Sequence, residues 1–154
     1  MHHSAESPIR EPDYGCCMDC TGFNLRKTMR SVSQLYDDML RQAGIRGTQF
    51  SLLVAIRMAG PVSVTQLAEI AVMDRTTLTR NLEVLQKQGL IRVAAGQDRR
   101  TRLATLSDEG RAVLAKAYPL WEQAQAHIKD SLSEERLQTL MEGLANLVKV
   151  TQAR

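Results

Sequence analysis

Three cysteines, Cys16, Cys17 and Cys20, lie within five residues of one another near the start of this 154-residue chain. They stand just before an expected helix, where the helix dipole lowers the pKa of a thiol and raises the thiolate fraction. A neighbouring thiol can resolve a sulfenic acid as a disulfide. The cluster indicates redox sensing at Cys16, Cys17 or Cys20, and the plainer alternative is a set of tail cysteines that sense nothing.

Zinc binding is a third interpretation of the same cysteines. Three thiolates and one imidazole, from His2 or His3, would supply the four ligands of a tetrahedral site. However, the adjacent pair Cys16 and Cys17 is poorly placed to bind one ion, and the histidines belong to a segment without apolar periodicity. We therefore expect no metal and no cofactor, and an odd, clustered set of cysteines is no disulfide framework.

The middle of the chain carries a different chemistry, the binding of a polyanion. Between Arg75 and Arg102 seven basic residues face two acidic ones, a net charge of +5, while the rest of the chain sums to −2. A solvated face rich in arginine would give the same count. The residue types favour DNA, because Arg75 and Arg80 can bind guanine edges or phosphates and Asn81 can bind adenine.

The expected elements around this segment can present those side chains to DNA. Apolar spacing predicts a short helix over Thr65–Ala71, and Asp74 stands as N-cap before a second helix over 75–88. Alternation at 91–93 and 103–106 then predicts a two-stranded hairpin with a basic turn. The second helix would enter the major groove, and the hairpin tip would enter the minor groove.

Helices are expected on both sides of this module, so the fold class is mainly α (α+β). Thr48 is expected to cap the helix that opens the module, Pro119 is expected to kink a long helix that follows the hairpin, and a last helix follows Ser133. We expect four parts: a flexible tail with the cysteines at 1–20, an N-terminal helix of a dimer base at 21–47, a winged helix-turn-helix DNA-binding module at 48–106, and C-terminal dimerisation helices at 107–154.

Several short motifs, in this order and spacing, resemble the MarR family of bacterial winged-helix regulators from about Asn24 to Val148. They are Thr48-Gln49-Phe50, Val64-Thr65-Gln66-Leu67-Ala68, Asp74-Arg75-Thr76-Thr77-Leu78-Thr79-Arg80, Leu85-Gln86-Lys87-Gln88-Gly89-Leu90-Ile91, Asp98-Arg99-Arg100 and Leu106-Ser107-Asp108-Glu109-Gly110. The resemblance implies a homodimer whose first and last two helices interleave. It also implies a transcriptional regulator, most often a repressor, that binds a palindromic operator in double-stranded DNA.

The resemblance also implies roles for individual residues. Arg100 would be the main minor-groove contact, Asp98 would brace the wing through an arginine, and Ser63 and Thr65 would touch phosphate. The full set of DNA-binding candidates is Ser63, Thr65, Arg75, Thr76, Thr77, Thr79, Arg80, Asn81, Asp98, Arg99 and Arg100.

Members of the family commonly respond to small aromatic acids, lipophilic compounds or oxidants. Candidates for an effector pocket are Tyr36, Phe50, Arg57 and Trp121, although each of them also suits a core or surface position. The peroxide-sensing OhrR branch places a reactive cysteine near the first helix and holds it with tyrosines of the second. This chain has no tyrosine at 50–53, which departs from that pattern.

The sequence argues against catalysis. It contains no Ser-His-Asp set, no glycine-rich phosphate loop and no metal-binding histidine motif. The alternative is a thiol-based redox protein using the Cys16, Cys17 and Cys20 cluster, but the strand-helix-strand setting of a thioredoxin-type motif is missing. No apolar run is long enough to span a bilayer and no signal peptide opens the chain, so we expect a cytoplasmic protein without a membrane partner.

Overall fold

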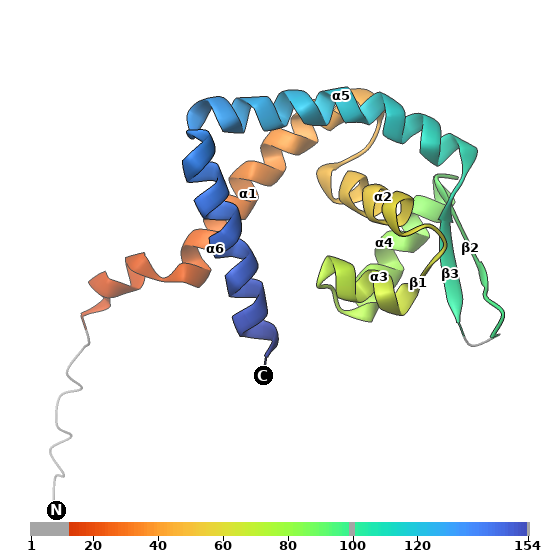
Figure 1. The fold of residues 1–154 in the computed structure, drawn as a ribbon, viewed down its shortest axis with the longest axis horizontal. Coiled ribbons are helices and arrows are strands. Elements are labelled where there is room, and N and C mark those ends of the chain that lie inside the picture. Colours follow the sequence, from red (N-terminus) through yellow and green to blue (C-terminus); the bar gives the residue numbers. More distant parts are fainter. Residues whose placement is uncertain (1–12, 99–100, 154) are drawn as a thin grey trace, which may run out of the picture. The chain divides into compact units, whose positions relative to one another are not determined.

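The computed structural model describes residues 13–98 and 101–153, and the chain divides into a small unit that ends at Val32 and a larger unit that begins at Ser33 (Figure 1). The elements are, in order, η1 (Tyr14–Asp19), α1 (Thr21–Leu40), η2 (Arg41–Ala43), α2 (Gly47–Ala59), β1 (Val62–Ser63), α3 (Val64–Ala71), α4 (Arg75–Lys87), β2 (Ile91–Ala95), β3 (Arg102–Leu106), α5 (Asp108–Ser131) and α6 (Glu134–Gln152).

The small unit contains the cysteines. Within the segment 1–20 that was expected to be a flexible tail, Tyr14–Asp19 form the 3₁₀ helix η1. The side chain of Asp13 starts this helix by accepting a hydrogen bond from the Gly15 N–H at 2.9 Å. Every residue of η1 is exposed, so the helix is held by this local cap and contributes nothing to a core.

The core of the larger unit lies among α2, α3, α4 and the sheet. The side chains of Leu53, Ile56, Leu67, Leu78 and Leu85 are almost completely buried there. Burying aliphatic side chains is the main term that stabilises such a small module, since aromatic residues make up only 4% of the sequence.

Helix α2 begins two residues earlier than the sequence predicted. The N-cap is Arg46 rather than Thr48. The side-chain Oε1 of Gln49 accepts from the Arg46 N–H at 3.0 Å, and the Phe50 N–H donates to the Arg46 carbonyl at 2.9 Å. These bonds satisfy the helix start without the Thr48 hydroxyl.

The sheet has three strands in the order β1-β3-β2, all antiparallel, where the sequence predicted two. Strand β1 pairs Val62 with Ala104 and Ser63 with Leu103. At two residues it is too short to show any alternation. Its pairing nevertheless fixes the start of α3 against the hairpin formed by β2 and β3, which we call the wing.

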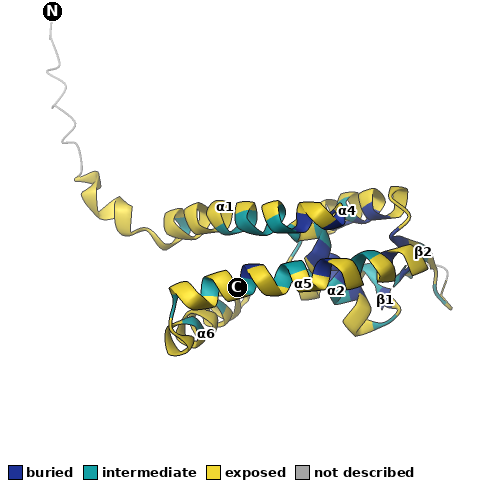
Figure 2. Ribbon diagram, turned by 90° about the horizontal axis from the view of Figure 1, so that it is seen from above, coloured by how far each residue is buried: buried dark blue, intermediate teal, exposed yellow. Residues whose placement is uncertain are grey.

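The two long C-terminal helices differ in burial. Helix α5 runs without a break through Pro119, and its first turn packs against the end of α4. Helix α6 begins at Glu134 after its N-cap Ser133, as predicted, and contains no buried residue (Figure 2). None of the helices described is long and apolar enough to cross a membrane.

Candidate nucleic-acid interface

The turn between α3 and α4 sets how α4 is presented. Val72 ends α3 with φ 51° and ψ 45°, in the left-handed region that β-branched residues rarely adopt. The backbone of Met73 returns to α3 by donating to the Ala68 carbonyl at 2.9 Å. The chain therefore reverses within two residues, which is the geometry of a helix-turn-helix.

Asp74 caps α4, as the sequence predicted. Its carboxylate accepts from the Thr77 N–H at 2.9 Å and from the Thr77 hydroxyl at 2.6 Å. These bonds hold the pKa of the Asp74 carboxyl below its usual value. The Thr77 hydroxyl proton is therefore committed to the cap, and the hydroxyl oxygen, as an acceptor, and the methyl group are left for a base.

The remaining candidates on α4 fall into two groups. The side chains of Thr76 and Arg80 are exposed and make no hydrogen bond with described residues, so they are available to DNA. Thr79 donates to the Arg75 carbonyl at 2.7 Å, and the Asn81 amide donates to the Thr77 carbonyl at 3.0 Å. Reading of adenine by Asn81 stays a prediction, for which the second N–H of its amide and the amide oxygen are left.

The start of α3 lies beside α4 and supplies two hydroxyl groups. Ser63 caps α3, since its Oγ accepts from the Gln66 N–H at 3.1 Å while Gln66 Oε1 accepts from the Ser63 N–H at 3.3 Å. Thr65 is exposed and makes no hydrogen bond with described residues. Phosphate contacts from this helix would therefore come first from Thr65 and from free backbone N–H groups.

The wing closes through backbone bonds near its tip. The Gly96 N–H donates to the Thr101 carbonyl at 2.8 Å, and the Thr101 N–H donates to the Asp98 carbonyl at 2.9 Å. Arg99 and Arg100, the predicted minor-groove contacts, lie outside the described residues. Bracing of the wing by Asp98 also stays a prediction.

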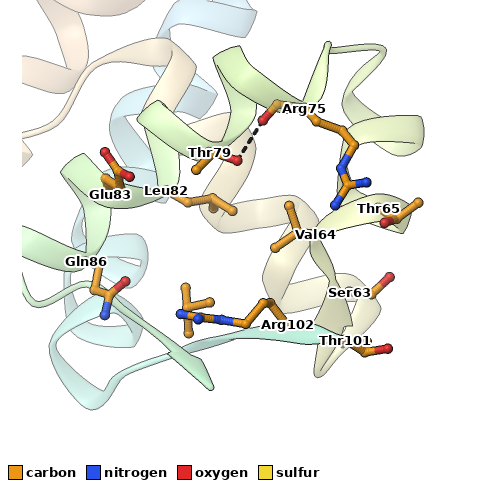
Figure 3. A pocket seen from close by; sticks show the side chains of 11 residues that line it. Ser63, Val64, Thr65, Arg75, Thr79, Leu82, Glu83, Gln86, Thr101 and Arg102 are labelled. Atoms are coloured by element: carbon orange, nitrogen blue, oxygen red, sulfur yellow. Dashed lines mark hydrogen bonds between the residues drawn. The ribbon is translucent and has the colours of Figure 1, made fainter. Parts of the chain in front are cut away.

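A pocket of about 570 Å³ lies between the start of α3, helix α4 and the wing (Figure 3). Its lining combines the predicted residues Ser63, Thr65, Arg75 and Thr79 with residues that the sequence argument missed. The missed residues are Val64, Leu82, Glu83, Gln86, Val93, Thr101 and Arg102.

Strand register explains why Arg102 belongs to this pocket. Arg102 pairs with Ala95, and Val93 pairs with Ala104, so all four side chains lie on one face of the sheet. Ala104 is buried on that face, and Val93 also lines the pocket. The alternation of Ala104 and Leu106 with their neighbours was the available signal, because it also assigns Arg102 to the inner face.

The four effector-pocket candidates do not form one group. Phe50 is buried and stacks on Trp121, with ring centroids 6.0 Å apart. Tyr36 is half-buried, which raises the pKa of its phenol, and it donates to Gln125 Oε1 at 2.7 Å. Arg57 instead lines a separate pocket of about 390 Å³ with Arg111.

All three cysteines are free and exposed. The pKa of the Cys20 thiol is lowered, first by the backbone N–H of Phe23, then by that of Gly22, in the first turn of α1. Cys16 makes a long contact of 3.6 Å from its thiol to the Asp13 carbonyl. Among residues 13–98 and 101–153, no three His, Cys, Asp or Glu side chains lie close enough to hold a metal.

Similarity to known proteins agrees with this geometry. A protein-family model described as MarR family matches residues 43–101 of this chain. The solved structure of M. tuberculosis transcriptional regulator MosR in complex with DNA is 39% identical, covers 87% of this chain and 97% of its own, and has a TM-score of 0.81. A probable transcriptional regulator from Pseudomonas aeruginosa is 31% identical, with 85% of this chain and 98% of its own covered and a TM-score of 0.77.

More distant relatives share the fold or the class of protein. MarR from E. coli, solved with operator DNA, is 21% identical with a TM-score of 0.79, covering 89% of this chain and 99% of its own. A Bacillus cereus protein named as an HTH-type transcriptional regulator is 28% identical over 79% of this chain and 82% of its own. These similarities favour a regulator over a thiol-based redox protein, and the chain belongs to the MarR family of transcriptional regulators.

Proposed function

We propose that the chain is a cytoplasmic repressor that binds a palindromic operator in double-stranded DNA as a homodimer. The observation that carries the proposal is the exposed N-terminal turn of α4, held by the Asp74 cap beside a basic wing. Thr76 and Arg80 are free on this turn to meet base edges in the major groove. The similarity to MosR, which was solved in complex with DNA, supports double-stranded DNA as the partner.

The dimer is proposed from the apolar surface of α6. This 19-residue helix contains no buried residue, although Leu140 and Leu147 lie on one stripe and are 46% and 39% exposed. An isolated helix of this length is marginal in water, so it needs a surface on which to pack. A second copy of the chain would supply that surface and present two α4 helices to two half-sites.

Selection of duplexes from a random pool, followed by mobility shifts, tests DNA binding. The selected sequences should be palindromic, and Arg80→Ala should lower the preference for them over scrambled DNA by about 1–3 kcal/mol, as expected for loss of a bidentate base contact. Lys87→Ala, two turns further along α4, is the matched control and should keep the preference. A wild-type protein that binds selected and scrambled duplexes equally would contradict the proposal.

Release by a small aromatic acid or an oxidant is part of the proposal. The exposed thiols and the lowered pKa of Cys20 support an oxidant, because the thiolate is the reactive form. Operator affinity should be measured for the wild type and for a triple Cys→Ser variant, each before and after mild peroxide and with salicylate-like acids. Affinity that is equal in every condition would exclude both kinds of signal.

A further inference from the structure

The pocket between α4 and the wing lies where a DNA strand must pass, if the protein binds DNA as proposed. A helix in the major groove and a wing in the adjacent minor groove are separated by one sugar-phosphate backbone. Helix α4 and strand β3 both line this pocket, and the start of α3 forms a third wall. A backbone strand between the two grooves would therefore run across its mouth.

The pocket contains two guanidinium groups that come from different elements. Arg75 reaches in from α4, and Arg102 reaches in from β3 (Figure 3). Neither of them forms a hydrogen bond or an ion pair through its side chain with a described residue, so both have donors to offer. The hydroxyl groups of Ser63, Thr65 and Thr101 lie on the same lining.

Three of the lining side chains are apolar, those of Val64, Leu82 and Val93. Apolar side chains can support the aliphatic stems of arginine while the charged heads stay in water. The lining therefore suits two arginines whose guanidinium groups bind an anion.

Glu83 is the one carboxylate on the pocket lining, and it lies on α4 one turn beyond Thr79. It makes no ion pair with Arg75 or Arg102 among the described residues. A carboxylate at this wall repels phosphate. The DNA backbone is therefore favoured on the side of α3 and β3, where the hydroxyl groups are.

We propose that Arg75 and Arg102 form a two-sided cradle for the phosphate backbone that separates the major from the minor groove. The proposal rests on the proposed DNA binding and assigns a role to each arginine within it. The role that is new is that of Arg102, as a DNA-positioning residue, while for Arg75 the cradle selects phosphate from the two partners that the sequence allowed. The cradle sets the angle between α4 and the wing on the duplex without reading sequence.

The sheet offers a matched control for Arg102. Arg92 pairs with Thr105, so its side chain lies on the opposite face from that of Arg102. Both arginines are exposed, and both lie on paired strands of the wing. Loss of either removes one positive charge, but only Arg102 faces the pocket.

The test measures affinity for a selected duplex and a scrambled duplex over a series of salt concentrations. Arg102→Ala and Arg75→Ala should each weaken binding to both duplexes by about tenfold or more. Each should also lower the slope of log affinity against log salt by about two for the bound dimer, because each of its two subunits loses one phosphate contact. Arg102→Lys, which keeps the positive charge, should retain most of the wild-type slope. Arg92→Ala should leave the slope close to that of the wild type.

Neutral methylphosphonate substitutions, introduced one at a time along the selected duplex, then locate the contact. One or two of them, between the grooves, should weaken the wild type and have no further effect on Arg102→Ala. If Arg102→Ala and Arg92→Ala have the same slope, or Arg75→Ala changes only sequence preference, the cradle is wrong while DNA binding stands. If the wild type binds neither duplex, the proposed function itself fails.

Discussion

Val72 adopts a backbone conformation that its side chain disfavours. The left-handed region costs an L-residue about 1–2 kcal/mol, and the cost is felt most by β-branched side chains. Val72 is 54% exposed, so little packing offsets this cost. The strain is therefore part of the turn that orients α4.

Val72→Gly should stabilise the protein by about 0.5–1 kcal/mol, because glycine adopts positive φ without strain. The greater entropy that glycine gives to the unfolded chain offsets only part of this gain. Val84→Gly is the control, since Val84 is 47% exposed within α4 and should instead destabilise by about 1 kcal/mol. Urea unfolding at one protein concentration measures both variants. A loss of stability in Val72→Gly would mean that Val72 packs on a surface outside the monomer.

Asp74 links the start of α4 to pH. Hydrogen bonds from Thr77 keep the pKa of Asp74 below the unfolded value of about 3.9. The charged cap therefore contributes its full stability above the unfolded pKa and loses it as the pH falls through the folded pKa. Acidification from about pH 5 to about pH 3 should lower the melting temperature of the wild type more than that of Asp74→Asn, whose neutral cap does not titrate.

Asp108 provides a check on that prediction. Arg111 also holds its pKa down, first through a hydrogen bond and then through its charge, so the pH dependence has the same sign. Asp108→Asn should remove a separate part of the fall in melting temperature on acidification. The double variant with Asp74→Asn should remove both parts. Identical acid curves for the wild type and Asp74→Asn would exclude the cap as a titrating element.

At the scale of elements, the junction between α4 and α5 gives a physical reason for two of the sequence motifs, Gly89-Leu90 and the run from Leu106 to Gly110. The buried Ser107 hydroxyl donates to the Gly89 carbonyl at 2.6 Å and accepts from the Gly110 N–H at 2.9 Å. The Ser107 N–H donates to the Leu90 carbonyl at 3.1 Å. The end of α4 is thus bonded to the first turn of α5.

Gly110→Ala should destabilise the protein by about 1–3 kcal/mol, the usual cost of overpacking. A Cβ at this position would lie 2.0 Å from the Leu90 carbonyl oxygen, so the backbone itself must move. Lys116→Ala, at an exposed position of the same helix, should change stability by less than about 0.5 kcal/mol. Thermal and urea unfolding compare the two, and equal stabilities would show that α5 shifts freely against α4.

The sequence predicted those elements whose ends are set by local bonds. Asp74, Ser107 and Ser133 cap their helices, and Gly89 ends α4 with φ 73°, all of which nearby residues dictate. Strand β1 was missed because its pairing with β3 depends on a partner some forty positions away. Arg102 was missed for a related reason, since its face follows from strand register rather than from residue type.

At the scale of the whole molecule, the exposure of α6 argues for assembly. Its apolar stripe includes Leu140, Met141, Leu147 and Val148, each between 39% and 58% exposed. A stripe of this length is unfavourable in water and favours association with a matching surface. The two DNA-facing helices of a dimer must then lie about 34–36 Å apart to reach successive major grooves.

A chain that ends before Ser133 should lose the dimer and with it tight operator binding, because each half-site alone supplies only part of the contacts. Leu140→Glu with Leu147→Glu is the milder change, since it places two charges on the stripe and leaves the helix in place. Asn146→Glu, on the opposite side of α6, is the control and should remain dimeric. Sedimentation should give monomer or aggregate for the truncated chain and monomer for the double variant, whose circular dichroism should lose no more helix than α6 itself contributes. A truncated chain that sediments as a stable, folded dimer would show that α6 is not what holds two copies together, and would direct the search for the interface to the other helices.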